Sequence, residues 1–337
     1  MLKNIKFHNF GPLRHIDWPG LGRINLVLGE NGSGKTFLLK ALYVAMRTLE
    51  EHRRGEENRT AAEILVEKLR WTFQSDKIGD LVTKGAAGAL TSTIELNDHM
   101  FEYSFGKDTT KQITSLENHV PPRSSNSIFL PAKEVLTLYN IILESREEKK
   151  HFGFDDTYLD LARSLRRSPK GGGNYAEFAR SRVMLEQMLD GKIEFDENSG
   201  RWYFKKGNQK FSVGDMAEGI KKIAILDTLL GNRYLDTSSI VFIDEPESAL
   251  HPAAISKLMD IVALLAKRGL QFFLASHSYF VVKKLYLIAL EKQMSIPVIS
   301  CEGNTWQCAD LKNGMPENSI INESINLYKN EVELALT

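Results

Sequence analysis

The stretch Gly29-Glu30-Asn31-Gly32-Ser33-Gly34-Lys35-Thr36 matches the phosphate-binding loop pattern G-x-x-x-x-G-K-[ST] at every fixed position. The glycines of such a loop let backbone N–H groups turn inward and surround phosphate oxygens. Lys35 is expected to reach the β- and γ-phosphates, and the Thr36 hydroxyl is expected to ligate Mg²⁺. The residues predicted to line the phosphates are Gly29, Asn31, Gly32, Ser33, Gly34, Lys35 and Thr36.

The residues on both sides of this loop have the patterns of a strand and a helix. Residues 24–28 are an apolar run typical of a buried strand that enters the loop, and residues 35–47 have the spacing of a helix that leaves it. The N-terminus of that helix would point at the bound anion, where free N–H groups and the helix dipole favour negative charge. This is the context that a phosphate-binding loop requires.

A second stretch, Ile240-Val241-Phe242-Ile243-Asp244-Glu245-Pro246, is an apolar run that ends in two carboxylates. Such a run suits a parallel strand buried on both faces, and ligands of open α/β sheets bind beyond the carboxyl ends of the strands. Asp244 is predicted to hold Mg²⁺, as the Walker B aspartate does. Glu245 points to the other side and is predicted to orient or deprotonate the attacking water.

The composition is that of an ordinary globular protein, with 26% charged and 42% hydrophobic residues among 337. Lys plus Arg and Asp plus Glu number 43 each, so the net charge gives no support for a nucleic acid or a membrane surface as partner. No apolar stretch approaches the ~18 residues that cross a bilayer, and residues 1–7 have no apolar signal core. We therefore expect a cytoplasmic protein with no membrane partner.

The order of elements predicts one domain with an insertion. Residues 1–105 contain strands, the phosphate loop and a helix that gives way to a solvated charged connection at residues 50–57. Residues 214–337 alternate helix and strand, as in the second half of a doubly wound domain. Residues 106–213 would be an inserted lobe, with a strand at 127–130, helices at 132–146, 157–167 and 175–189, and a strand meander at 192–213.

Three further segments frame the chain. They are Ile5-Lys6-Phe7-His8-Asn9-Phe10-Gly11-Pro12-Leu13, Asp244-Glu245-Pro246-Glu247-Ser248-Ala249-Leu250-His251-Pro252 and Ala275-Ser276-His277-Ser278. Together with the phosphate loop they resemble the ABC-type ATPases of the SMC, RecF and OLD group, the AAA-labelled ATPases often found in phage-defence operons. The resemblance covers the middle lobe only loosely. It implies an α/β fold of the P-loop ABC-type ATPase class, with a mixed sheet, flanking helices and a long inserted α+β lobe, and it implies hydrolysis of ATP with Mg²⁺.

In this family two subunits sandwich two ATP molecules head to tail, so the resemblance implies a homodimer or a higher oligomer. Each site joins the phosphate loop of one chain to a signature segment of the other, usually L-S-G-G-[QE] before a helix. The best match is residues 216–222, in which Gly219 would let a backbone N–H approach the partner's γ-phosphate. Ala217 stands where the family has serine. An alternative register, residues 211–215, keeps the serine as Ser212 with Gly214, and Asp215 also fits a simple helix N-cap.

The resemblance assigns further site residues. His277 matches the switch histidine that contacts the γ-phosphate, which gives Lys35, Glu245 and His277 as the catalytic set and Thr36 and Asp244 as metal ligands. Gln74 is placed as the glutamine that touches Mg²⁺ and the water, with an exposed glutamine at a helix end as the alternative. Apart from the resemblance, Lys133 and Glu134 are interpreted as a solvated ion pair, with side chains that face the nucleotide or the partner as the alternative, and Glu247 is interpreted as a cap of the next helix.

The leading hypothesis is an ATPase that dimerises with ATP and controls a separate effector, a nuclease or toxin, in anti-phage defence. About 60 residues follow His277, fewer than the ~100 of a further catalytic domain. The alternatives are a DNA-bound repair ATPase of the SMC or RecF type and an ABC transporter ATPase, which the degenerate signature and long insertion disfavour. DNA would need a phosphate-tracking patch. The candidates are Arg163, Arg166, Arg167, Lys170, Arg180 and Arg182, for which the neighbouring acids and the neutral total charge favour a solvated helix face.

Overall fold

The computed structural model describes residues 1–113, 115–166, 178–303 and 305–336. The first strands are β1 (Leu2–Phe10), β2 (Leu13–Trp18), β3 (Ile24–Gly29), β4 (Leu90–Leu96), β5 (His99–Phe105), β6 (Ser115–Asn118) and β7 (Ile128–Leu130). The later strands are β8 (Lys192–Asp196), β9 (Arg201–Lys206), β10 (Gln209–Ser212), β11 (Ile240–Asp244), β12 (Gln271–Ser276), β13 (Pro297–Glu302) and β14 (Thr305–Asp310). The α-helices are α1 (Lys35–Glu51), α2 (Ala61–Phe73), α3 (Tyr139–Leu143), α4 (Asp156–Leu165), α5 (Ala179–Leu189), α6 (Glu218–Gly231), α7 (Pro252–Lys267), α8 (Tyr279–Lys292) and α9 (Ser319–Leu336).

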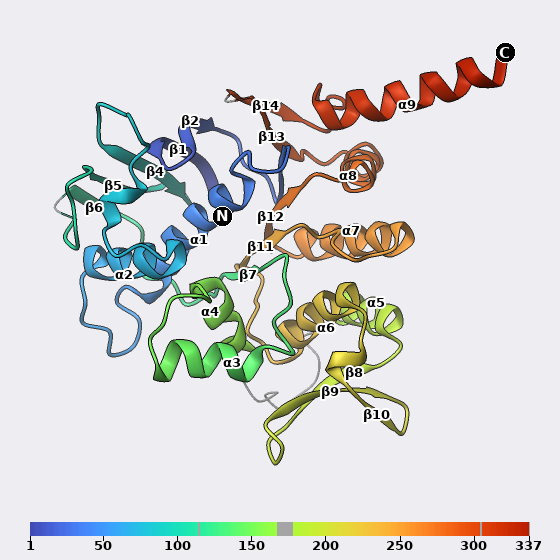
Figure 1. Cartoon of the computed structure of the whole chain (residues 1–337), viewed down its shortest axis with the longest axis horizontal. Coiled ribbons are helices and arrows are strands. Elements are labelled where there is room, and N and C mark those ends of the chain that lie inside the picture. Colours follow the sequence, from blue (N-terminus) through green and yellow to red (C-terminus); the bar gives the residue numbers. More distant parts are fainter. Residues whose placement is uncertain (114, 167–177, 304, 337) are drawn as a thin grey trace.

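A six-stranded sheet of order β14-β13-β3-β12-β11-β7 runs through the middle of the molecule (Figure 1). Its strands are parallel except for β14, which pairs with β13 in the antiparallel sense. β12 lies between β3 and β11, so that Ala275 is paired with Val27 on one side and with Asp244 on the other. The C-terminal ends of β3 and β11, which are far apart in the sequence, therefore lie at the same end of the sheet, on either side of β12.

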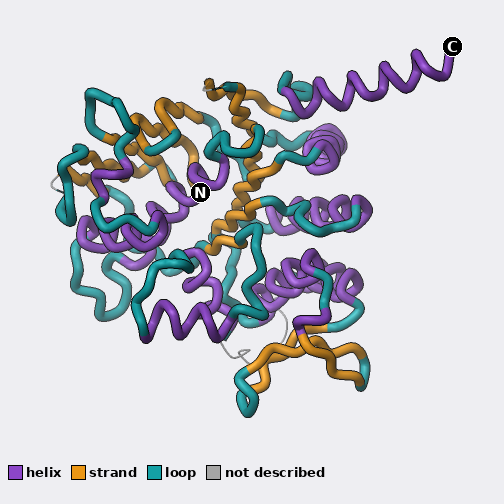
Figure 2. The backbone as a smooth tube through the Cα atoms, in the orientation of Figure 1, coloured by secondary structure: helices purple, strands orange, loops and turns teal. Residues whose placement is uncertain are grey.

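The two faces of this sheet are covered by different layers (Figure 2). On one face, Val27 and Phe273 pack with α1 and with the antiparallel sheet of order β2-β1-β4-β5-β6. On the other face, Leu26 and Leu274 pack with α6, α7 and α8. Every residue of β3, β11 and β12 is buried, which explains why these strands are mostly apolar. The predicted α/β fold with a mixed sheet and flanking helices is confirmed.

The middle of the chain does not form one separate layer. β7 lies within residues 106–213 but pairs in parallel with β11 as the edge strand of the central sheet. β8, β9 and β10 instead form a small antiparallel sheet that stands apart at one end of the molecule (Figure 1, lower right). The ends of the helices predicted at 157–167 and 175–189 lie outside the described residues. The division at residues 106 and 213 stays a prediction.

The helix predicted at residues 132–146 is wrong in its first half. Helical structure begins only at Tyr139 and continues into a π-helical turn, Glu144–Glu148. The Glu134 carboxylate accepts hydrogen bonds from the backbone N–H groups of Leu136 and Thr137. A side chain that captures local N–H groups in this way competes with the helical hydrogen-bond pattern.

The charged connection predicted at residues 50–57 is also wrong at its start, because α1 extends to Glu51 and Glu50 is fully buried. The Glu50 carboxylate accepts hydrogen bonds from the backbone N–H and the hydroxyl of Ser127, at 2.9 and 2.6 Å, and pairs with Arg47 at 3.0 Å. Arg47 also pairs with Asp160 of α4, at 3.2 Å. Buried charges fix α1 against α4 and against the segment that leads into β7.

We expect Glu50→Ala to lower the free energy of unfolding by about 2–4 kcal/mol, because it removes one of the carboxylates paired with the buried Arg47 and leaves the backbone N–H and hydroxyl of Ser127 buried without their acceptor. Urea denaturation followed by circular dichroism would measure the change. Glu56→Ala, at an exposed position just beyond α1, is the control and should change stability by less than about 0.5 kcal/mol. Equal stability of the two variants would contradict a stabilising role for the buried network.

Candidate nucleotide-binding site

The phosphate loop leaves the end of β3 and leads directly into α1. Gly34 precedes the first residue of α1 with a φ of 94°, a left-handed conformation that favours glycine. A Cβ atom on Gly29 would lie 2.6 Å from the Ser33 hydroxyl, so a side chain at position 29 would displace the loop. The Ser33 hydroxyl oxygen is buried and has no hydrogen-bond partner among the described residues. A phosphate oxygen bound in the loop would satisfy it.

Lys35 folds back over the loop. Its ammonium donates hydrogen bonds to the carbonyl oxygens of Gly29 and Glu30, at 2.7 and 2.8 Å. Burial lowers the pKa of Lys35, although the carboxylates of Asp244 and Glu245 oppose the shift. A cation held by two neutral carbonyls and partly removed from water is well placed to exchange them for phosphate oxygens.

Thr36 of α1 and Asp244 of β11 are distant in the sequence but lie next to each other in the structure. The Thr36 hydroxyl lies 2.9 and 3.1 Å from the two carboxylate oxygens of Asp244. Burial raises the pKa of Asp244, and the hydrogen bond from Thr36 acts in the opposite direction. The described residues contain no group of three or more His, Cys, Asp or Glu side chains that would hold a metal. The hydroxyl of Thr36 and the carboxylate of Asp244 are oxygen groups that would hold a Mg²⁺ ion together with nucleotide phosphates and water.

Glu245 and His277 face each other across the ends of β11 and β12. Glu245 has a φ of 47°, uncommon for a residue other than glycine, and its N–H donates a hydrogen bond to the carbonyl of Ala275 at 2.9 Å. The Glu245 carboxylate lies 3.6 Å from Nδ1 of His277. The predicted base and the predicted switch histidine are thus neighbours.

Glu247 is a residue of this site that the sequence did not reveal. Its Oε1 accepts hydrogen bonds from the Ser276 hydroxyl at 2.8 Å and from the backbone N–H of His277 at 3.1 Å. The Glu247 side chain is only 9% exposed, and its other carboxylate oxygen is buried with no hydrogen-bond partner among the described residues. One carboxylate therefore ties the segment after β11 to the segment after β12 that carries His277.

The prediction that Glu247 caps the next helix is wrong. The residue that caps α7 is His251, whose Nδ1 accepts a hydrogen bond from the N–H of Ala253 at 3.2 Å. The Glu247 carboxylate instead accepts hydrogen bonds from Ser276 and His277, which are close to it only because β11 and β12 are paired.

The first turn of α6 packs against the segment after β11. A Cβ atom on Gly219 would lie 2.5 Å from Cδ2 of Leu250 and 2.6 Å from the carbonyl oxygen of Ala249, so glycine is required there by packing alone. The Lys222 ammonium donates hydrogen bonds to the carbonyl oxygens of Asp244 and Glu245, at 3.3 and 2.7 Å. Burial lowers the pKa of Lys222, although the nearby carboxylates oppose the shift. The approach of Gly219 to a partner's phosphate stays a prediction.

The alternative positions for the signature segment have local roles. Asp215 is not the N-cap of α6, which is Ala217 and has no side-chain cap. Ser212, the last residue of β10, and Gly214 are both exposed, and the Ser212 hydroxyl accepts a hydrogen bond from the N–H of Gly214 at 3.1 Å.

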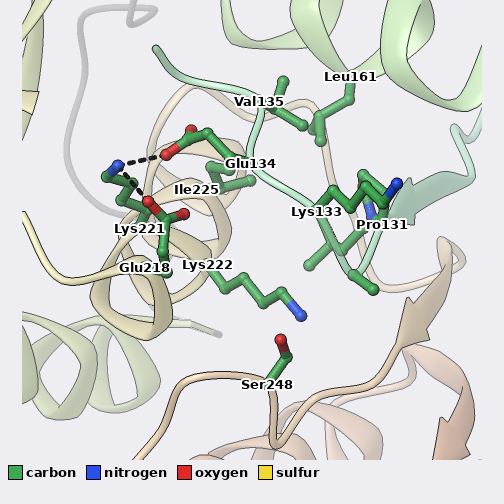
Figure 3. A pocket seen from close by; sticks show the side chains of 12 residues that line it. Pro131, Lys133, Glu134, Val135, Leu161, Glu218, Lys221, Lys222, Ile225 and Ser248 are labelled. Carbon is green, nitrogen blue, oxygen red and sulfur yellow. Dashed lines mark hydrogen bonds and ion pairs between the residues drawn. The ribbon is translucent and has the colours of Figure 1, made fainter. Parts of the chain in front are cut away.

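A pocket borders the site on the side of α6 (Figure 3). Glu134 does not form a solvated ion pair with Lys133, as the sequence predicted, but pairs with the buried Lys221. Lys221 also pairs with Glu218 at 2.8 Å, while the side chain of Lys222 extends toward Ser248 across the pocket (Figure 3). The segment after β7 is thus joined to α6 by the ion pair between the half-buried Glu134 and the buried Lys221.

Gln74 is not hydrogen-bonded to the predicted metal ligands among the described residues. Gln74 follows α2 with a φ of 53°, and the ring of the preceding Phe73 packs 4.4 Å, between centroids, from Phe37. Within residues 1–113 and the other described ranges, no hydrogen bond joins Gln74 to Thr36 or Asp244. Its role as a metal ligand stays a prediction.

Some of the candidate DNA-binding arginines are paired inside the chain. Arg163 binds Glu147 at 2.7 Å, and Arg182 binds Asp227 at 2.9 Å. Arg167 and Lys170 lie outside the described residues.

The part of the chain that the structure describes contains no helix long and apolar enough to cross a membrane.

The chain has a phosphate loop between β3 and α1, and Thr36 of that loop is hydrogen-bonded to Asp244 of β11. These features define it as a protein of the P-loop class with an α/β fold. Residues 24–283 match the family described as "AAA domain, putative AbiEii toxin, Type IV TA system", and the chain belongs to that family. The comparison with curated proteins gives no significant match.

The fold is similar to solved SMC head domains. An SmcHead bound to the C-winged helix domain of ScpA is 13% identical, with a TM-score of 0.53 over 92% of this chain and 97% of that chain. A Smc head domain with an extended coiled coil, bound to the C-terminal domain of ScpA derived from Pyrococcus furiosus, is 10% identical, with a TM-score of 0.50 over 98% and 99%. The predicted resemblance to the SMC group is confirmed at the level of the fold, and its phage-defence part stays a prediction.

We expect Lys35→Ala to weaken ATP binding on the order of 100-fold or more, because it removes the one cation that the loop holds against the phosphates. Equilibrium binding of a fluorescent ATP analogue would measure the loss. Lys257→Ala, an exposed lysine of α7, is the control. Unchanged affinity in Lys35→Ala would refute the assigned role.

We expect Glu247→Ala to lower kcat for ATP on the order of 10-fold with KM within about twofold, because Glu247 acts through the position of His277. Glu247→Gln keeps one carbonyl oxygen that accepts both hydrogen bonds and should retain most of the activity. A double-mutant cycle separates this role from general stability: in a His277→Ala background, Glu247→Ala should have little further effect. Full additivity of the two losses would show that Glu247 acts independently of His277.

Proposed function

We propose that the chain is an ATPase that binds Mg²⁺·ATP in the loop between β3 and α1 and transfers the γ-phosphoryl group to water. Lys35 neutralises phosphate charge, Thr36 and Asp244 hold Mg²⁺, and Glu245 orients the attacking water with His277 beside it. The contact between the Thr36 hydroxyl and the Asp244 carboxylate, at 2.9 Å, is the observation that carries the proposal. Phosphoryl transfer depends mainly on such positioning and on charge stabilisation.

ATP is further proposed to join two copies head to tail, with Gly219 of each copy at the phosphates of the other. The SMC head fold and the family's pairing of sites support this arrangement. Positively polarised N–H groups at the start of α6 favour an anion, and no side chain caps that end. A homodimer formed with ATP and released by hydrolysis would act as a switch.

The switch is proposed to control a separate effector, a nuclease or a toxin, in anti-phage defence within the cytoplasm. The family description names a toxin of a toxin–antitoxin system, which supports a chain that works with a second component. The sheet formed by β8, β9 and β10 stands apart from the central sheet and offers a surface for that component (Figure 1).

A DNA-bound ATPase of the SMC or RecF type is the second candidate, and the SMC head fold is the observation that favours it. The internal pairing of Arg163 and Arg182 weighs against it. DNA-stimulated hydrolysis that falls steeply with salt would support this candidate.

We expect Glu245→Gln to retain ATP binding but to slow turnover on the order of 100-fold or more, because the amide no longer accepts the proton of the attacking water. Phosphate release and light-scattering mass, each with and without ATP, would test both parts of the proposal. With ATP, the Glu245→Gln variant should show the mass of a dimer and keep it, whereas the wild type should return to its lower mass as it hydrolyses the ATP. Glu323→Gln, on the exposed face of α9, is the control. Normal turnover in Glu245→Gln would refute the proposal that Glu245 orients the attacking water.

A further inference from the structure

The side chain of Lys222 joins α6 to the turn that carries Glu245. It extends from α6 toward Ser248 across the pocket (Figure 3). Its ammonium reaches two successive backbone carbonyls, and the shorter hydrogen bond, at 2.7 Å, is to the carbonyl of Glu245. A hydrogen bond from a charged donor is stronger than one between neutral groups. Lys222 therefore holds the backbone of the residue that is proposed to orient the attacking water.

The backbone conformation of Glu245 depends on such partners. Its φ of 47° lies in the left-handed region, which residues other than glycine occupy where the surrounding structure holds them. On one side, the N–H of Glu245 is bound to the carbonyl of Ala275 at 2.9 Å. On the other side, its carbonyl accepts hydrogen bonds from Lys222 and from the N–H of Ser248, at 2.7 and 3.0 Å. Loss of the charged donor would loosen the turn that places the Glu245 carboxylate beside His277.

The start of α6 is fixed to the same segment at a second point. Gly219 lies one helical turn before Lys222, on the same side of α6. At Gly219 the helix lies so close to Ala249 and Leu250 that a Cβ atom would be within 2.6 Å of both. Close packing at Gly219 and hydrogen bonds from Lys222 thus join one helix to one segment. A displacement of the start of α6 would be passed to the backbone at Glu245.

We propose that Lys222 is a positioning residue that couples the phosphates bound at the start of α6 to the carboxylate of Glu245. The inference rests on the proposed function, in which Gly219 of each copy meets the nucleotide of the other. Contact with that nucleotide fixes α6 and, through Lys222, the turn at Glu245. Loss of the contact lets the turn relax, so hydrolysis in each copy depends on the presence of the other. Lys222 acts through the backbone and touches neither ATP nor the attacking water.

The kinetic test compares Lys222→Met with Lys222→Arg. Lys222→Met keeps an unbranched apolar side chain but removes the ammonium, so kcat for ATP should fall on the order of 10-fold with KM within about twofold. Lys222→Arg keeps a charged donor and should retain most of the activity. With ATP, Lys222→Met should form a dimer and keep it, because Gly219 is unchanged. In a Glu245→Gln background, Lys222→Met should cause little further loss.

A second readout needs no nucleotide. Hydrogen–deuterium exchange in residues 245–250 should be at least about threefold faster in Lys222→Met than in the wild type, because the turn opens more often. Lys221→Met is the matched control on the same helix. Lys221 is bound to Glu134 and Glu218 and not to the backbone of residues 245–250. Lys221→Met should keep kcat and the exchange of residues 245–250 within about twofold of the wild type, even where it lowers the melting temperature.

The outcomes separate this inference from the proposed function. If the wild type hydrolyses ATP and Lys222→Met is equally fast, or Lys221→Met is equally slow, the coupling role is overturned. Unchanged exchange of residues 245–250 in Lys222→Met would also overturn it. A wild type that hydrolyses no ATP would overturn the proposed function, and the exchange measurement would still decide whether Lys222 holds the turn.

Discussion

The parallel pairing of β12 with β3 on one side and β11 on the other is the constraint on which the site depends. It places the phosphate loop, the carboxylates after β11 and the segment that carries His277 at one edge of one sheet. Both faces of these strands are covered, so their registers are fixed by packing on two sides. The position of Asp244 relative to Thr36 thus follows from the sheet core.

Buried and half-buried charged side chains then join the helical layers to this core. Glu50 holds α1 to the segment before β7, Glu134 holds the segment after β7 to Lys221 of α6, and Lys222 binds the backbone carbonyls at the end of β11. Each of these groups is satisfied by a partner from a distant part of the chain. Such contacts make the arrangement of layers specific, because a shifted helix would leave a charge buried and unpaired.

The difference between what the sequence predicted and what it missed has one physical origin. The phosphate loop and the strand that ends at Asp244 are continuous local patterns, so residue order alone was enough to place them on the sheet. Glu50, Glu134 and Glu247 were interpreted as solvated or capping residues because a charge with no local partner usually faces water. Their partners, Ser127, Lys221 and Ser276, become neighbours only through the tertiary fold.

The place of β3 in the sheet has a consequence for biosynthesis. This fully buried strand is made early, but both of its neighbours, β12 and β13, come from the last quarter of the chain. Until the ribosome has released residues beyond Glu302, β3 exposes an apolar strand with two unpaired edges. A nascent segment with two unpaired strand edges is prone to aggregation.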